Sequence, residues 1–208
     1  MRNLIIALLM ALPLSATAQG IIRHDTPKPQ RQQTTKKPAA KQAAKPAPKA
    51  ADPIKKLYSD MVYVEGGTFT MGAKADENYW DVEHAWPAHQ VTVSGFYLCR
   101  YETTQALWQK VMGKNPSEYR GANHPVESVS WNDIQKFIRK LNALTGKHYR
   151  LPTEAEWEWA ARGGKRSQGY RYSGSNNANE VAVYGENPEA KVKKPYYMGC
   201  KKPNGLGL

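Results

Sequence analysis

Cysteine is scarce in this chain of 208 residues, which contains only Cys99 and Cys200. Neither belongs to a C-x-x-C pair, and this argues against a zinc ribbon or a thioredoxin-type redox centre. In an oxidising compartment the two could form a disulfide, and two separate buried thiols are an equal alternative. The sequence leaves both interpretations open.

Long apolar runs are also lacking. The longest, residues 4–14, is too short to span a bilayer, which takes about 20 residues. It follows Arg2 and precedes Ala16-Thr17-Ala18, as in a secretory signal peptide cleaved before Gln19. No cysteine follows this leader, which argues against a lipid anchor. We therefore predict a signal peptide over 1–18, no transmembrane segment after cleavage, and a secreted, periplasmic or cell-envelope protein.

Acidic and aromatic residues are rare in the segment that follows. Residues 21–53 hold eight Lys or Arg, two Asp and six Pro, so they have too little apolar surface to fold and should form an extended, self-repelling linker. We place this linker at 19–56. It could attract a protein or an anionic envelope polymer, although a solvated spacer is favoured. Without aromatics for base stacking, specific nucleic-acid binding is not expected.

The remaining residues, 57–208, carry the patterns of a folded α+β domain. Alternation over 61–65 and 68–72 around Gly66-Gly67 predicts a hairpin, and 90–101 reads as strand. Three helices are predicted: from Thr103 or Thr104 to Met112, from Ser130 to Gly146, and from Thr153 to Gly163. The predicted buried stripes are Ile134, Phe137, Ile138, Leu141 and Leu144 in the second of these helices and Trp157, Ala160 and Ala161 in the third.

The third helix has marked ends. Thr153 and Glu156 have the spacing of a capping box, and Gly163 and Gly164 suit its close. Residues after 163 show little periodicity and should be mostly loop and short strand, with a strand-like terminus at 205–208. Between the first strands, His84 and His89 lie near four carboxylates. Their spacing is not that of zinc ligands on one helical turn, and a surface loop is favoured over a metal site.

Several collinear segments resemble the formylglycine-generating enzyme, or sulfatase-modifying factor, family. They are MVYVEGGTFTMG at 61–72, FYLCRYETT at 96–104, PVESVSW at 125–131 and RLPTEAEWE at 150–158, continued at 179–187 and 202–208. The resemblance implies a C-type-lectin-related α+β fold with short strands, three or so helices and long loops, here partial and incomplete at its C-terminus. It also implies an ancestral activity, the oxygen-dependent oxidation of a protein cysteine to formylglycine.

The family chemistry uses two cysteines near the C-terminal end that bind copper(I), a metal that prefers soft thiolate ligands. Neither Cys99 nor Cys200 matches these positions, so no catalytic residue is carried over and the copper ligands are absent from this sequence. A family calcium segment resembles residues 178–180 and makes Asn179 a calcium candidate, although a turn-forming role is favoured for it. Calcium is thus the cofactor that the resemblance leaves open.

Three functions follow from this sequence. The first is a formylglycine-generating enzyme, which needs a thiol pair that this chain does not supply. The second is a non-catalytic scaffold or binding module of the cell envelope. The third is a non-haem iron relative completed by a partner domain, and no facial triad is evident among His24, His84, His89, His124 and His148.

Overall fold

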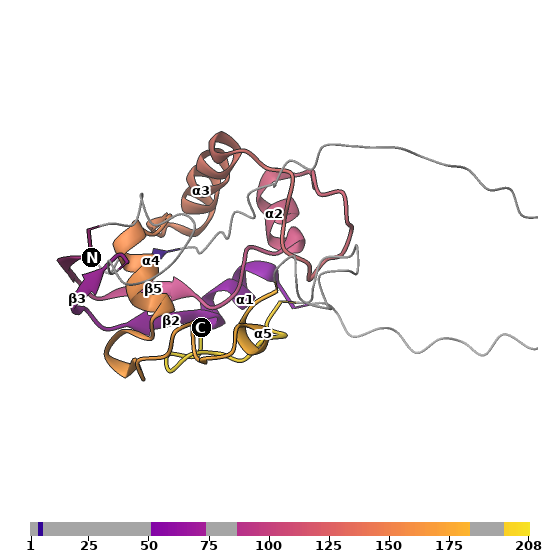
Figure 1. Ribbon diagram of the computed structural model, residues 1–208. Coiled ribbons are helices and arrows are strands. Elements are labelled where there is room, and N and C mark those ends of the chain that lie inside the picture. The colour runs from indigo at the N-terminus through magenta and orange to yellow at the C-terminus, as the bar shows by residue number, and fades with distance from the viewer. Residues whose placement is uncertain (1–3, 6–50, 74–86, 184–197) are drawn as a thin grey trace, which may run out of the picture. The chain divides into compact units, whose positions relative to one another are not determined.

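The protein is an α+β domain with short strands and long connections, as predicted. The computed structural model describes residues 4–5, 51–73, 87–183 and 198–208. In chain order the elements are β1 (Leu4–Ile5), α1 (Pro53–Ser59), β2 (Met61–Val64), β3 (Gly67–Met71), β4 (His89–Val93), β5 (Phe96–Cys99), α2 (Gln105–Met112), α3 (Trp131–Thr145), β6 (Tyr149–Arg150), α4 (Glu154–Ala161), the 3₁₀ turn η2 (Gly164–Arg166) and α5 (Ala178–Val181). Figure 1 labels most of them.

Two sheets organise the strands. The larger has the order β2-β5-β1-β6, in which β2 runs antiparallel to β5 and β1 runs parallel to both of its neighbours. The smaller sheet pairs β3 with β4 in antiparallel register. The predicted hairpin of β2 and β3 is therefore wrong, because these two strands belong to different sheets.

Gly66 and Gly67 explain that error. A Cβ on Gly66 would lie 2.5 Å from the carbonyl oxygen of Val93, and one on Gly67 would lie 2.8 Å from the indole ring of Trp159. The two glycines thus allow close backbone and ring approach where the chain passes from one sheet to the other, a use of glycine distinct from a tight turn. Sequence alone does not separate the two uses.

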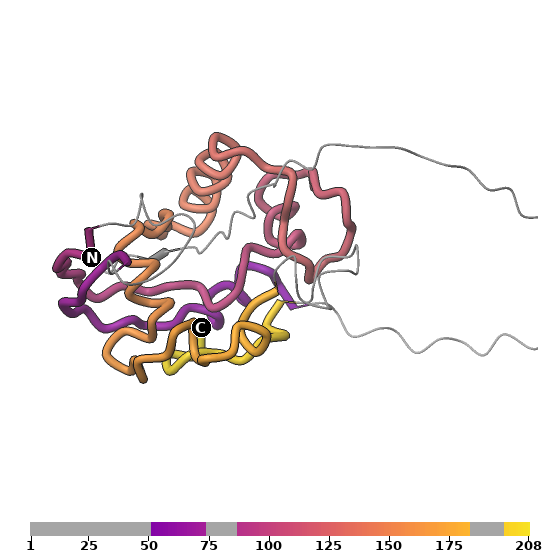
Figure 2. Tube along the Cα trace, viewed as in Figure 1, coloured from indigo at the N-terminus to yellow at the C-terminus, as the bar shows by residue number. Residues whose placement is uncertain are grey.

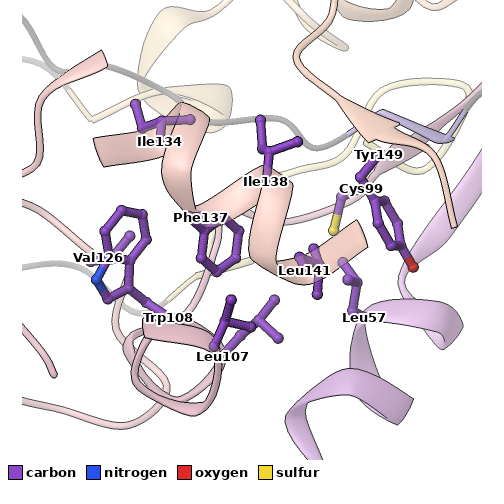
Figure 3. Packing of buried hydrophobic residues seen from close by; sticks show 11 residues of the cluster. Leu57, Cys99, Leu107, Trp108, Val126, Ile134, Phe137, Ile138, Leu141 and Tyr149 are labelled. Carbon is purple, nitrogen blue, oxygen red and sulfur yellow. The ribbon is translucent and has the colours of Figure 1, made fainter. Parts of the chain in front are cut away.

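Successive residues of the larger sheet point to opposite faces, and each face buries its own core. On one face Cys99 and Tyr149 join a cluster with residues of α1, α2 and α3, in which Trp108 stacks on Phe137 with ring centroids 4.8 Å apart (Figure 3). On the other face Val64, Phe96 and Leu98 pack with Trp159 and Ala160 of α4. Figure 3 shows the first cluster at close range, and its members are Leu57, Cys99, Leu107, Trp108, Val111, Val126, Ile134, Phe137, Ile138, Leu141 and Tyr149.

Local signals placed the helices correctly. The Thr104 side chain caps α2, and Gly113 closes it in the left-handed region. Ser130 and Asp133 form a reciprocal capping box at α3, which Gly146 closes in the same way. Four of the five predicted core residues of α3 are buried. Leu144 is the exception at 61 % exposed.

The capping box of α4 is confirmed, but its predicted buried face is only partly right: Ala160 is buried as predicted, Ala161 is half-buried and Trp157 is exposed. Thr153 and Glu156 bond reciprocally as expected. Trp159 is the buried tryptophan, whereas Trp157 is 45 % exposed. The Trp159 indole N–H donates to the backbone oxygen of Glu65 at 2.9 Å, and the Trp159 ring lies 5.3 Å from that of Phe69. The side of α4 that faces the sheets is set by this distant bond, which helical spacing does not encode.

The two ends of the domain also differ from prediction. The predicted linker ran to residue 56, but α1 begins at Pro53, because Asp52 accepts a hydrogen bond from the N–H of Ile54 and Pro53 suits the first helical turn. At the other end, 205–208 form a turn and no strand. Leu206 and Leu208 pack against the α4 core, so the terminal segment folds back onto the domain (Figure 2).

Asn204 holds the terminal segment against the end of α4. Its buried side chain donates to the backbone oxygens of Ala160 and Ala161 at 2.8 and 3.2 Å and accepts from the N–H groups of Leu206 and Leu208. Carbonyls at a helix C-terminus lack partners within the helix. A side chain more than 40 residues further along the chain therefore supplies partners for the last turn of α4.

The charged start of α4 predicts acid sensitivity. Burial alone would raise the pKa of Glu156, but hydrogen bonds from the Arg150 guanidinium and the Thr153 N–H lower it below its usual value. A folded-state pKa below that of the unfolded chain, about 4.3, gives stability that is present above that pH and lost as pH falls through the folded pKa. Glu156→Gln should therefore lower stability at neutral pH and flatten its decline below about pH 4.3.

Chemical denaturation at a series of pH values between about 2.5 and 7 measures this effect. That range extends about two pH units to either side of the normal pKa of a glutamate side chain. Glu154→Gln is the matched control, since Glu154 is an exposed first-turn residue of the same helix. An identical pH profile for the wild-type chain and Glu156→Gln would refute the assignment.

Candidate functional site

The two cysteines do not form a pair in the structure. Cys99 ends β5 inside the core and Cys200 is exposed, and both are free thiols. Burial raises the pKa of Cys99 to about 11, despite a hydrogen bond from the backbone of Tyr101 that acts the other way. Thiolate is the form that binds metal and attacks substrates. These two thiols therefore do not fit the copper(I) centre of the resembled family.

This separation predicts unequal thiol reactivity. Cys200 should react with an aromatic disulfide reagent at pH 8 within minutes, whereas Cys99 should react only on unfolding, because it is buried and protonated. Native protein should thus release one equivalent of chromophore, and guanidinium-unfolded protein two. Cys200→Ser should abolish the fast reaction and keep the slow one. Fewer than two thiols in the unfolded, unreduced protein would show that the disulfide forms.

Asn179 lies on α5, where lysines occupy the surroundings of a would-be calcium site. The Lys201 ammonium donates to the Asn179 backbone oxygen at 2.8 Å, and Lys202 lies 3.5 Å from the carboxylate of Glu180. The pKa of Glu180 is lowered mainly by the hydrogen bond from Ser175 and further by the positive charge of Lys202. Oxygen ligands that already face ammonium groups do not fit Ca²⁺, which needs six to eight free oxygens.

The histidines were the remaining metal candidates. Among 4–5, 51–73, 87–183 and 198–208, no three His, Cys, Asp or Glu side chains gather closely enough to hold a metal ion. His89 starts β4 as an exposed residue, and its ring Nδ1 lies 3.1 Å from the oxygen of Pro87. His24 and His84 lie outside the described residues, as does most of the loop that precedes β4. In the residues that the structure describes, no helix is long and apolar enough to cross a bilayer.

A cavity of about 530 Å³ lies beside the start of α2. Amide and cationic side chains share its wall with small apolar residues, and the lining is Pro53, Gln105, Ala106, Gln109, Lys110, Asn115, Arg120, Gly121 and Ala122. Lys110 has no ion pair within the described residues. Such a wall offers donors for the carbonyl or carboxylate oxygens of a bound chain.

The buried side chain of Gln105 holds the loop that forms part of the cavity wall. It is 1 % exposed, and its amide N–H groups donate to the backbone oxygens of Tyr119 and Pro125 at 2.8 and 3.1 Å. Its amide oxygen accepts from Asn115 and from the N–H of Gly121. One side chain thereby fixes four points of the loop over 115–125.

A residue with an unusual backbone conformation lies shortly after this loop. Ser128 has a φ of 59°, a left-handed value that is rare without glycine. Its neighbour Glu127 accepts hydrogen bonds from the Ser128 hydroxyl and the N–H of Tyr119. Burial alone would raise the Glu127 pKa, but these bonds and the nearby Arg120 charge lower it. Sequence analysis missed this site because Gln105, as a polar residue in a first helical turn, looks like an ordinary surface position.

The sequence of this domain matches a known family. A model of the sulfatase-modifying factor enzyme 1-like domain matches residues 46–208. The chain belongs to this family. The chaperone protein LppX of Paenibacillus barcinonensis is 37 % identical over 73 % of this chain and 68 % of its own length. The mouse formylglycine-generating enzyme is 28 % identical over 71 % of this chain.

The chain spans 54 % of the mouse enzyme, about half its length. Among solved structures, Treponema denticola variable protein 1 is similar at a TM-score of 0.59 and 28 % identity, over 71 % of this chain and 67 % of that one. The family resemblance inferred from the four motifs is thus confirmed. One of these relatives is named a chaperone protein and the other an enzyme, so the activity of this chain has to be argued from its own residues.

Proposed function

We propose that this member of the formylglycine-generating enzyme family is a non-catalytic, polypeptide-binding module that is exported by its leader. The observation that carries the proposal is the placement of the thiols. Oxidation of a substrate cysteine through copper(I) needs two thiolates at one metal, and here Cys99 is buried with a raised pKa while Cys200 is exposed.

Binding fits the same structure better than redox chemistry does. The cavity beside Gln105 presents amide and cationic side chains on a loop held by four hydrogen bonds, an arrangement that contacts a ligand without reacting with it. LppX, which is similar over most of this domain, is named a chaperone protein. Export rests on the pattern of residues 1–18 and on their charge and cleavage signals.

Two assays test the proposal. Oxygen uptake with copper(I) and a cysteine-containing sulfatase peptide should equal that of a variant with Cys99→Ala and Cys200→Ser. The wild-type chain should also slow the aggregation of reduced insulin B chain at equimolar concentration. Uptake that the double variant loses would contradict the non-catalytic assignment, and unchanged aggregation would contradict polypeptide binding.

A further inference from the structure

The cavity beside α2 is lined by charge of one sign. Its charged lining residues are Lys110 and Arg120, and none of the nine lining residues is acidic. Its volume of about 530 Å³ falls within the range of about 300–1,000 Å³ that is usual for ligand pockets. The small apolar residues Pro53, Ala106 and Ala122 form part of the same wall. The cavity therefore offers positive charge next to a short apolar surface.

The two cations differ in what they already contact. Arg120 donates to the backbone oxygen of Asn115 at 2.6 Å, and its charge also acts on Glu127, a carboxylate that accepts two hydrogen bonds from nearby residues. Lys110 is exposed, and in the part of the chain that the structure describes its ammonium makes no ion pair. A lysine in the last turn of a helix also suits the helix dipole. It is the second cation on the same cavity that points to an anionic ligand.

The backbone that carries Arg120 is held in place by the domain itself. The N–H of Ala106 donates to the backbone oxygen of Ala122 at 3.0 Å, which joins the start of α2 directly to the loop. A Cβ on Gly121 would lie 2.5 Å from Nδ1 of His124, so the loop packs closely at this point. Binding groups that are already ordered lose less entropy when a ligand arrives.

The chain's own linker is an unsuitable occupant, although it leads to the cavity wall at Pro53. Residues 21–53 carry eight Lys or Arg and only two Asp, and like charges repel. One of these two acidic residues, Asp52, accepts the N–H of Ile54 at the start of α1. The charge of the cavity therefore favours an acidic group from another molecule.

We infer that this cavity binds a carboxylate of a client polypeptide, either its C-terminal group or an acidic side chain, together with an adjoining small apolar residue. The Lys110 ammonium and the remaining guanidinium N–H groups of Arg120 donate to the carboxylate oxygens, and such charge-assisted hydrogen bonds are stronger than neutral ones. The apolar residue lies against Ala106 and Ala122. The inference rests on the proposed function and deepens it by naming the group that is bound.

Three N-terminally labelled fluorescent peptides test the inference on the full 208-residue chain. The first is Gly-Ser-Gly-Ala-Val with a free C-terminal carboxylate, the second is its C-terminal amide, and the third is the amide of Gly-Ser-Glu-Ala-Val. The first, the third or both should bind about tenfold more tightly than the second, which has no carboxylate. Tight binding of the first alone identifies the chain terminus as the source, and tight binding of the third alone identifies the side chain. Equal binding of all three, or binding of none, would overturn the inference.

Lys110→Gln tests whether the cavity is the binding site. It removes one of the two charges and should weaken binding of the carboxylate peptide about fivefold, the upper range for an exposed ion pair. Lys110→Arg keeps the charge and should restore the affinity. The matched control is Lys114→Gln, which removes an exposed charge outside the cavity lining and should change the affinity less than about twofold. Equal losses for the two glutamine variants would show general charge attraction and would overturn the site.

A fourth peptide tests the linker as the occupant. It has the sequence of residues 36–49, in which every charged residue is a lysine, and it carries a C-terminal amide. This peptide should not bind. Binding as tight as that of the carboxylate peptide would make the chain's own linker the occupant and would overturn the inference.

The insulin assay, run on the wild-type chain and on Lys110→Gln, separates the two proposals. Suppressed aggregation without selective binding of a carboxylate peptide refutes the carboxylate site and leaves polypeptide binding standing. Selective binding that Lys110→Gln weakens, without any effect on aggregation, supports the carboxylate site and contradicts the polypeptide-binding function.

Discussion

Trp159→Ala should lower the free energy of unfolding by about 3–5 kcal/mol, the usual cost of deleting a large buried aromatic side chain. The indole is 7 % exposed and lies against Phe69 and against the backbone of Gly67, which has no Cβ to keep it away. Its removal would leave a cavity between α4 and the smaller sheet. It would also leave the backbone oxygen of Glu65 without its donor.

Trp157→Ala is the matched control for this prediction. The same residue type, two positions earlier on the same helix, is 45 % exposed, so its loss should cost no more than about 1 kcal/mol. Urea denaturation followed by circular dichroism compares the two variants. Similar losses, or a larger loss for Trp157→Ala, would show that α4 is rotated about its axis relative to this description.

Gln105→Met should lower the free energy of unfolding by about 3 kcal/mol, since it leaves several polar groups around the 1 % exposed side chain of residue 105 without their partner. Methionine matches the length of glutamine but offers neither amide group. The oxygens of Tyr119 and Pro125, the amide of Asn115 and the N–H of Gly121 would each lose a partner. Because all four belong to one loop, limited proteolysis should begin to cut within 115–125.

Gln109→Met provides the comparison. Gln109 is exposed and lines the same cavity one helical turn later, so its replacement should change stability by no more than about 0.5 kcal/mol. If Gln105→Met also unfolds without faster cleavage of 115–125, the glutamine supports the helix rather than the loop.

Interactions between near neighbours could be predicted from the sequence, and interactions across the chain could not. Thr104, Ser130 and Thr153 cap helices through partners three residues away, a distance that sequence displays directly. Trp159 and Gly66 acquire their roles from residues far along the chain. The choice between the two tryptophans, and between a turn and a crossing at Gly66-Gly67, was therefore beyond local pattern.

The candidate site divides in the same way. The absence of a C-x-x-C pair was visible in the sequence, and the separation of Cys99 from Cys200 agrees with it. The Gln105 cavity needed the structure, because one amide reaches partners 10 to 20 residues away.

The reach of Asn204 has a consequence for the order in which the protein matures. Synthesis proceeds from the N-terminus, so α4 leaves the ribosome well before the residue that completes its last turn. Until position 204 is available, Ala160 and Ala161 lack that partner and the core under Leu206 and Leu208 stays open. This part of the core should therefore close only after residue 204 has been made.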